Sequence, residues 1–250
     1  MSDNRLYLYI MGSKNKEDRI STAVPYKINE EELFFGPCNE EFLGGDREKL
    51  DLDNSNKEIY IAGINPSYGK PRKFLFLGKI KTIFSFKTAW EHYQDRNDLD
   101  IKLMIKRKYS PLHLKPIPEG YKHRTKEHSG KWIEDITSQK PSNEKEIYRN
   151  GIITNKETIF NRDCCFSMDN IFFSLKGDHV IKIDKQFIDL IKKGMKKTGN
   201  QKRIETHIGS DETAPFGYCE NGTRYGRGFT LILKNNDVDK FLELIDNKIN

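Results

Sequence analysis

The stretch RLYLYIM (residues 5–11) decides the fold class, because it is the first strongly patterned segment of the chain. Leu6, Leu8 and Ile10 alternate with Tyr7, Tyr9 and Met11, which is the two-residue period of a β-strand. One face of this strand is aliphatic and the other is largely aromatic. We therefore expect a β-sheet to begin here.

Further strands and helices follow from the same kind of pattern. Three helices are predicted, one over residues 87–94 after a Ser85 cap, one after Asp184 and one after Asp237. The proline-dotted stretch 109–143 is predicted to be a long irregular insert. Without repeats or low-complexity linkers, we expect one domain over residues 1–250, with inserts near 109–143 and 198–224. The other predicted strands cover residues 58–65, 72–86 with a β-bulge at Gly78, 169–175, 179–183 and 226–234.

The composition is that of a folded protein with no membrane segment. Hydrophobic residues make up 36% of the 250 residues, and 15 Phe and 11 Tyr supply bulky core material. No run approaches the roughly 18 apolar residues that cross a bilayer, and the first residues lack a secretory pattern. We expect a cytoplasmic protein with four reduced cysteines and no membrane partner. The sequence leaves the oligomeric state open.

Positive charge is concentrated in the middle of the chain. Residues 1–60 carry a net charge of −5 and residues 134–250 a net charge of +1, whereas residues 61–133 hold 16 Lys and Arg against 6 Asp and Glu, a net charge of +10. A polyanion such as nucleic acid would meet this segment first. A solvated lysine-rich surface is the alternative. The cations that stand out are Lys70, Arg72, Lys73, Lys79, Lys81, Lys102, Lys106, Arg107 and Lys108.

Familiar catalytic and cofactor motifs fail on spacing. Gly63 and Gly69 are one residue too far apart for a phosphate-binding loop, and Pro71 replaces the hydroxyl residue that holds magnesium. Gly226 and Gly228 precede a strand instead of opening a helix, which excludes a dinucleotide-binding turn. The histidines are scattered and no Cys-x-x-Cys motif occurs. We therefore predict no cofactor and no metal site.

Two polar segments contain residues typical of ligand binding. His128, Trp132, Glu134 and Asp135 lie close together in a loop-rich stretch, where Trp132 is either a stacking platform or a plug at the edge of the core. Residues 224–229 place Arg224 and Arg227 around glycines, which suits phosphate contact or a turn that leads into a strand.

The order of these segments resembles a known family. The LYLYI strand, the FFGPC turn, FLFLGKIKTIFSFKTAWEHY, the HSGKWIEDI loop, the DNIFFSL strand and the closing YGRGF strand are similar to the nucleotide-modification-associated domain of the second type. The resemblance spans about residues 5–248, although the stretches 111–127 and 198–220 depart from it. More loosely, the layout is similar to PUA-like and EVE-like readers of modified bases. The resemblance implies an α+β fold, with a mixed, largely antiparallel sheet or a partly open PUA-like barrel, flanking helices and long inserts.

The leading hypothesis is a nucleic-acid or nucleotide binding module, associated with DNA modification or with phage and defence systems, that accommodates an unpaired, flipped or modified base. Cations would hold phosphates while aromatic side chains stack on the base, and an amide would read its edge. The base-binding candidates are Phe35, Asn65, Tyr68 and Trp132. The phosphate-binding candidates are Lys70, Arg72, Lys73, Arg107, Arg224 and Arg227.

Two other function classes stay open at this point. The first is an enzyme acting on nucleotides or DNA bases, with His128, Glu134 and Asp135 as candidate acid and base residues. The second is a non-catalytic accessory protein whose basic surface has no ligand.

Overall fold

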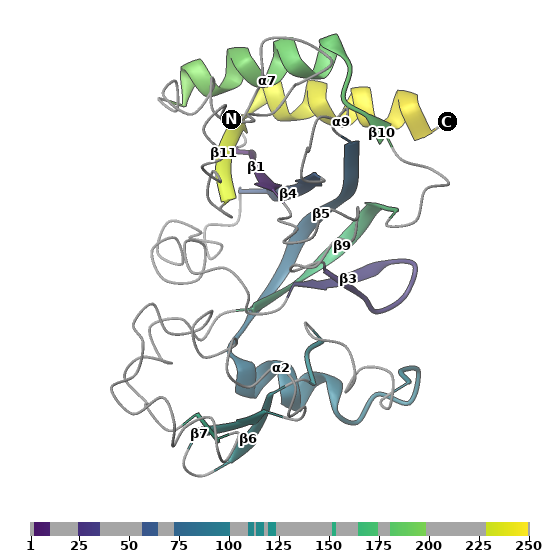
Figure 1. Cartoon of the computed structure of the whole chain (residues 1–250), viewed down its shortest axis with the longest axis vertical. Helices are drawn as coiled ribbons and strands as arrows, with labels where there is room; N and C mark the ends of the chain where they lie inside the picture. The colour runs from purple at the N-terminus through teal and green to yellow at the C-terminus, as the bar shows by residue number, and fades with distance from the viewer. Residues whose placement is uncertain are drawn as a thin grey trace, which may run out of the picture. The chain divides into compact units, whose positions relative to one another are not determined.

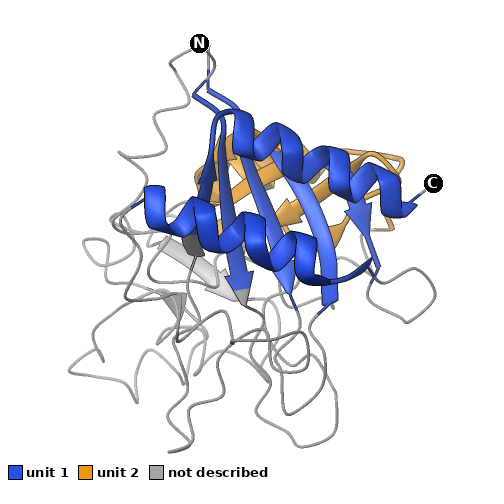
Figure 2. Cartoon of the chain, turned by 90° about the horizontal axis from the view of Figure 1, so that it is seen from above, with its two compact units in different colours: residues 1–22, 51–79, 170–250 blue, residues 23–50, 80–169 orange. Residues whose placement is uncertain are grey.

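A computed structural model describes residues 3–10, 25–35, 57–64, 73–100, 110–112, 114–117, 120–123, 152–153, 165–174, 181–198 and 229–249. Over these residues the strands are mixed but largely antiparallel, and three helices accompany them (Figure 1). The expected α+β class is therefore confirmed. The chain divides into unit 1 (residues 1–22, 51–79 and 170–250) and unit 2 (residues 23–50 and 80–169), coloured in Figure 2. Two boundaries between the units, at residues 79–80 and 169–170, fall inside continuous strands. The expectation of a single domain therefore stays a prediction.

Unit 1 is built on strands from both ends of the chain. Its elements are β1 (Arg5–Ile10), β4 (Ile59–Ile64), residues 73–79 of β5 (Lys73–Phe84), residues 170–173 of β9 (Cys165–Phe173), β10 (Ile181–Lys182), α7 (Lys185–Lys197), β11 (Phe229–Lys234) and α9 (Asn236–Ile249). The strands follow the order β11-β1-β4-β5, with β10 paired to β5. β1 runs parallel to β4 and antiparallel to β11. Leu6, Tyr7, Leu8 and Tyr9 are all buried, so both faces of β1 are covered.

Helices α7 and α9 lie side by side over one face of these strands (Figures 1 and 2). Their apolar positions recur at helical spacing and enter one core with Leu6 and Leu8 of β1. Phe74, Phe187 and Phe241 form an edge-to-face cluster there, with ring centroids 5.1 to 5.5 Å apart. Three buried rings thus join β5 to α7 and α9.

Gly194 lets α7 approach β11 closely. A Cβ atom at this position would lie 2.2 Å from Leu233 Cδ2 and 2.3 Å from the Ile232 carbonyl oxygen. Such distances are far inside van der Waals contact, so any larger residue forces the helix or the strand to move. Glycine weakens a helix interior, and its presence here is explained by this packing.

The helix starts are confirmed at Ser85 and Asp184 and corrected at Asp237. Asp184 accepts hydrogen bonds from the backbone N–H groups of Gln186 at 3.1 Å and Phe187 at 3.3 Å. Asp237 was expected to cap the last helix, but α9 already begins at Asn236. The turn before it is formed by Asn235, whose φ of 52° is left-handed, a conformation that asparagine tolerates.

The irregularity in β5 lies at Leu75 and not at Gly78, where it was expected. Gly78 pairs in regular register with Ile61, whereas the register against β4 shifts between Gly63 and Ile64 and leaves Leu75 opposite neither residue. The Phe76 ring occupies the space above Gly63, where a Cβ atom would lie 1.9 Å from Phe76 Cε1. The register shift therefore occurs next to the Gly63 position that the Phe76 ring covers, and the sequence pattern does not reveal this ring position.

Unit 2 contains β2 (Tyr26–Lys27), β3 (Glu32–Phe35), residues 80–84 of β5, α2 (Phe86–Tyr93), β6 (Leu114–Ile117), β7 (Gly120–His123), β8 (Ile152–Ile153) and residues 165–169 of β9. β3 pairs antiparallel with β2 and with β9. α2 begins with a capping box between Ser85 and Thr88. Its buried face packs with Phe34, Phe84 and Cys165 in a second core.

The stretch expected to be an irregular insert contains a β-hairpin. β6 and β7 pair antiparallel, and β8 joins on the other side of β7. Pro116 lies in β6, and β6 is an edge strand of this small sheet. Proline is tolerated at an edge because it removes only an outward N–H donor, but its presence hides such strands from sequence patterns.

Candidate functional site

Of the residues predicted to form a site, the structure describes Phe35 and Lys73. Phe35 is buried, whereas Lys73 is partly exposed. The remaining candidates lie outside the described residues: Asn65, Tyr68, Lys70, Arg72, Arg107, His128, Trp132, Glu134, Asp135, Arg224 and Arg227.

Phe35 is a buried residue of β3 in unit 2. Its side chain is 2% exposed, and its ring stacks on Phe166 with centroids 5.2 Å apart and planes within 7°. β3 and β9 place the two rings together as register partners. Packing accounts for this position, and a ring so covered offers no face to a base in this conformation.

Lys73 begins β5 and lies directly opposite Lys182 of β10. Residues opposite each other in an antiparallel pair share one face, and like charges at such positions repel. Lys182 is exposed and forms no salt bridge with another described residue. The fold therefore joins a lysine of the basic segment with a lysine 109 positions later in the chain. Residues 179–183 were predicted as a strand, but sequence reasoning missed Lys182 as a site residue because no local signal gives the partner or the register.

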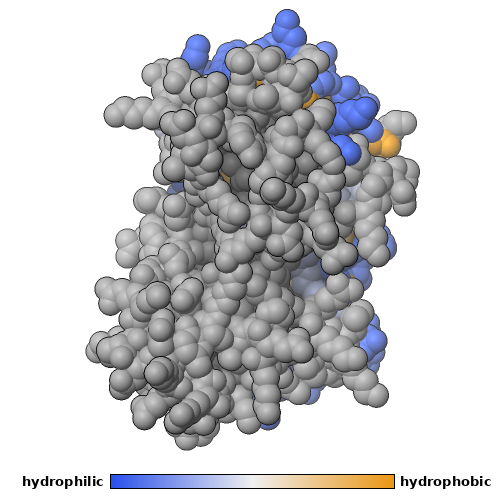
Figure 3. Space-filling view, in the orientation of Figure 1, coloured by the Kyte–Doolittle hydropathy of each residue, from blue (hydrophilic) through white to orange (hydrophobic). Residues whose placement is uncertain are grey.

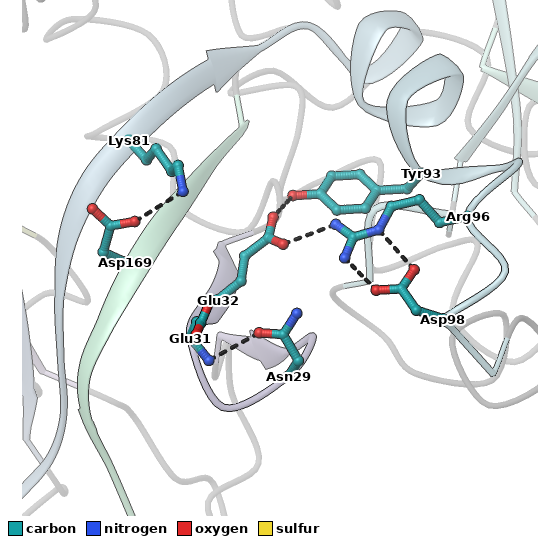
Figure 4. A network of polar contacts seen from close by, with 8 residues as sticks. All are labelled: Asn29, Glu31, Glu32, Lys81, Tyr93, Arg96, Asp98 and Asp169. Atoms are coloured by element: carbon teal, nitrogen blue, oxygen red, sulfur yellow. Dashed lines mark hydrogen bonds and ion pairs between the residues drawn. The ribbon is translucent and has the colours of Figure 1, made fainter.

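Two other lysines of the basic segment are held by carboxylates. The Lys79 ammonium lies 2.6 Å from Glu58 Oε1, and the Tyr60 hydroxyl donates to Glu58 Oε2 at 2.6 Å. The hydrogen bond from Lys79, followed by that from Tyr60, lowers the pKa of Glu58. Lys81 lies 3.2 Å from an Asp169 oxygen, with both side chains largely exposed (Figure 4). The paired carboxylates partly neutralise these lysines and weaken their attraction for a polyanion.

Arg96 is the centre of a polar network in unit 2 (Figure 4). It donates to Glu32 Oε2 at 2.8 Å and to both oxygens of Asp98, at 2.9 Å and 2.5 Å. The Tyr93 hydroxyl donates to the other Glu32 oxygen, and burial together with this hydrogen bond raises the pKa of Tyr93. The hydrogen bond to Asp98 is the largest cause of the raised pKa of Arg96.

This network ties the end of α2 to β3 and leaves both Glu32 oxygens occupied. The guanidinium also lies over the Tyr93 ring, 5.5 Å from its centroid. Because its donors and acceptors satisfy one another, the cluster stabilises unit 2 and is not a ligand site. The sequence shows Arg96 as one more cation of the basic segment and gives no sign that it is neutralised.

Two other kinds of feature, a metal-binding cluster and a membrane-spanning helix, are absent from the part of the chain that is described. No group of three or more His, Cys, Asp or Glu side chains there is arranged to hold a metal ion. None of the described helices combines the length and apolar character of a membrane span.

Comparisons with known proteins add no relative. No family model, no curated protein and no solved structure matches this chain. The resemblance to nucleotide-modification-associated and PUA-like domains therefore stays a prediction.

Proposed function

We propose that this protein is a nucleic-acid or nucleotide binding module that accommodates an unpaired, flipped or modified base. The observation that carries the proposal is the Lys73–Lys182 pair, which places two like charges opposite each other at the start of β5. Lys73 belongs to the segment 61–133 with its net charge of +10. Two ammonium groups on one face of an antiparallel pair form a positively charged position that attracts a phosphate group.

The base would be held by residues near this pair in the sequence. Asn65 and Tyr68 follow β4 and precede Lys73, so the chain brings an amide, an aromatic ring and a cation within a short stretch. Trp132 is the second stacking candidate. Stacking of one base on an aromatic side chain contributes roughly 1–3 kcal/mol. The proposal includes a PUA-like arrangement of the strands around the bound base. It does not include Phe35 as a base-binding residue, because the Phe35 ring is buried.

The first test is a salt titration of binding. Fluorescence anisotropy of mixed-sequence single-stranded and duplex DNA and of single-stranded RNA is measured between about 50 and 300 mM salt. The proposal predicts a linear fall of log affinity with log salt concentration, with a slope of about −0.7 per phosphate contact for single strands and −0.9 for duplex DNA. Absence of binding to all three polymers and to free nucleotides would contradict the proposal.

Substitution then locates the phosphate contact. Lys73→Gln combined with Lys182→Gln should weaken binding and make the salt slope less steep by about 1 to 2. The control is Lys234→Gln with Lys240→Gln, because these lysines are exposed and their replacement changes the net charge equally. Equal weakening by both double variants would show that only the total charge matters and would remove the Lys73–Lys182 site.

Tryptophan fluorescence tests the base contact separately. The chain has two tryptophans, and the Trp90 indole N–H donates to Gln94 Oε1 at 2.6 Å. Trp90→Phe therefore leaves Trp132 as the only indole emitter. Quenching of the remaining emission by nucleotides or oligonucleotides is expected if a base stacks on Trp132. Unchanged emission at saturating ligand excludes Trp132 from the pocket.

A further inference from the structure

The outward face of α7 is unusually rich in lysine. The helix carries five lysines and one aspartate, and its exposed or half-exposed positions hold nearly all of them. At 100° per residue, Lys185, Lys192, Lys193 and Lys196 fall on the same side as Asp189. In the view of Figure 3, the described residues at the top, where Figure 1 shows α7 and α9, are mainly hydrophilic. We call Lys185, Lys192, Lys193 and Lys196 the α7 lysine face.

These lysines differ from the others in their surroundings. Lys197 contacts the Asp237 carboxylate, and Lys248 of α9 lies 2.8 Å from Asp184. None of the four residues of the α7 lysine face forms a salt bridge with another residue in the described ranges. With Asp189 as the one carboxylate on this side of α7, the face keeps a net positive charge.

Stabilisation of the helix itself does not explain this cluster. Cations in the last turn interact favourably with the helix dipole, which accounts for Lys196 and Lys197. Lys185 lies in the first turn, where the dipole disfavours a cation. Lys192 and Lys196 are four residues apart, a spacing at which like charges repel. Asp189 lies three and four residues before Lys192 and Lys193 and offsets part of this repulsion, so what the helix dipole and the spacing leave unexplained is the net positive charge of the face.

The burial of the apolar side of α7 favours a polymeric anion over a bilayer as the partner, because the helix cannot insert that side into lipid. Phe187, Ile188, Ile191 and Met195 are buried in the core of unit 1, and Gly194 packs against β11. A helix that binds a bilayer surface inserts its apolar face. On α7 only the charged side is available, and its lysines extend over about 16 Å from Lys185 to Lys196 at 1.5 Å per residue.

We propose that the α7 lysine face binds the sugar-phosphate backbone of nucleic acid, as a second contact surface besides the Lys73–Lys182 pair. A length of about 16 Å matches about five base-pair steps at 3.4 Å each, so several phosphates are reached together. This inference rests on the proposed function, and it assigns to that function a surface outside the basic segment of the sequence.

The test compares two triple variants in the salt titration described above. Lys192→Gln, Lys193→Gln and Lys196→Gln together should weaken binding by about 10- to 100-fold near 150 mM salt and make the slope less steep by about 2 to 3. Glutamine keeps the helix propensity of lysine, and thermal unfolding followed by circular dichroism verifies that the variant folds. The control, Lys87→Gln with Lys234→Gln and Lys240→Gln, lowers the net charge equally at other exposed positions and should cost less than about 3-fold.

The outcomes separate this inference from the proposed function. If the wild-type protein binds with steep salt dependence but the α7 variant binds equally well, the α7 surface is wrong and the proposed function stands. If the wild type binds none of the nucleic acids, both fail. If vesicles of phosphatidylserine and phosphatidylcholine are bound through the α7 lysines and nucleic acid is not, the partner is a membrane and the inference is overturned.

Discussion

The lysines of β5 and those of α7 carry the same charge in different surroundings. Lys79 and Lys81 lie in the segment with the largest positive charge in the sequence, yet both contact carboxylates, from Glu58 and Asp169. The α7 lysine face comes from residues 134–250, whose net charge is only +1 because acidic residues elsewhere in that part of the chain balance the lysines. Charge summed along the sequence therefore does not identify the cations that a ligand meets. The pairing of each lysine with carboxylates in the folded chain also has to be known.

The largest expected effect comes from loosening α7. Phe187→Ala removes one ring of the cluster with Phe74 and Phe241 and should lower the free energy of unfolding by about 3–5 kcal/mol. Urea denaturation measures the change. Ile249→Ala is the control, because Ile249 is 48% exposed and its loss should be nearly neutral. Similar losses in both variants would show that α7 does not depend on the buried cluster.

A smaller loss is expected from Gly194→Ala. Alanine improves helix propensity by about 1 kcal/mol, but its Cβ atom meets the Ile232 carbonyl oxygen. Overpacking against backbone typically costs 1–3 kcal/mol, so we expect a net loss of stability despite the better helix former. A more stable variant in the same urea experiment would show that α7 is not seated this closely on β11.

Removing the carboxylate that pairs with Lys79 tests whether pairing separates the lysines of β5 from those of α7. Glu58→Gln releases Lys79 and removes a nearby negative charge. If pairing is what keeps Lys79 from a polyanion, affinity for single-stranded DNA should rise by about 2- to 5-fold, with one further phosphate contact in the salt slope. Glu243→Gln on α9 is the control for the change in net charge. Equal effects of the two substitutions would mean that pairing is unimportant.

The smallest effect is on the pH dependence of stability. The hydrogen bonds from Lys79 and Tyr60 lower the pKa of Glu58 in the folded protein. Its contribution is therefore present above the ordinary glutamate pKa of about 4.3 and is lost as pH falls through the lower folded-state pKa. Because the pair is partly exposed, we expect Glu58→Gln to cost less than about 1 kcal/mol at pH 7, and the cost should shrink as the pH falls below the ordinary glutamate pKa. A cost that persists in acid would assign it to packing.

Much of the fold follows from the sequence, since local signals are strong where a strand or helix buries one regular face. The alternation in β1 and the caps at Ser85 and Asp184 are of this kind. Other features depend on contacts between distant segments: the hairpin around Pro116 requires an edge position, and the irregularity at Leu75 accompanies the Phe76 ring above Gly63. The prediction of a bulge at Gly78 used only the presence of a glycine, and it was wrong because the irregularity depends on the partner strand β4.

The candidate site was less predictable than the fold. Phe35 is apolar and adjacent to a turn in the sequence, and only the partner strand shows that its ring is covered by Phe166. Lys182 and the α7 lysines carry no motif. Spacing along α7 predicts that its lysines share one face, but whether acidic residues neutralise them depends on tertiary pairing.

The central claim is that a polyanion meets the lysines that the fold gathers into clusters, Lys182 opposite Lys73 and the α7 lysine face, and not isolated lysines such as Lys234 and Lys240. Acetylation footprinting, with each lysine quantified by mass spectrometry in the presence and absence of a saturating oligonucleotide, tests it in the unmodified protein. We predict protection of Lys182, Lys192, Lys193 and Lys196 and little change at Lys234 and Lys240. Protection of Lys79 and Lys81 with full reactivity of the α7 lysines would contradict the claim.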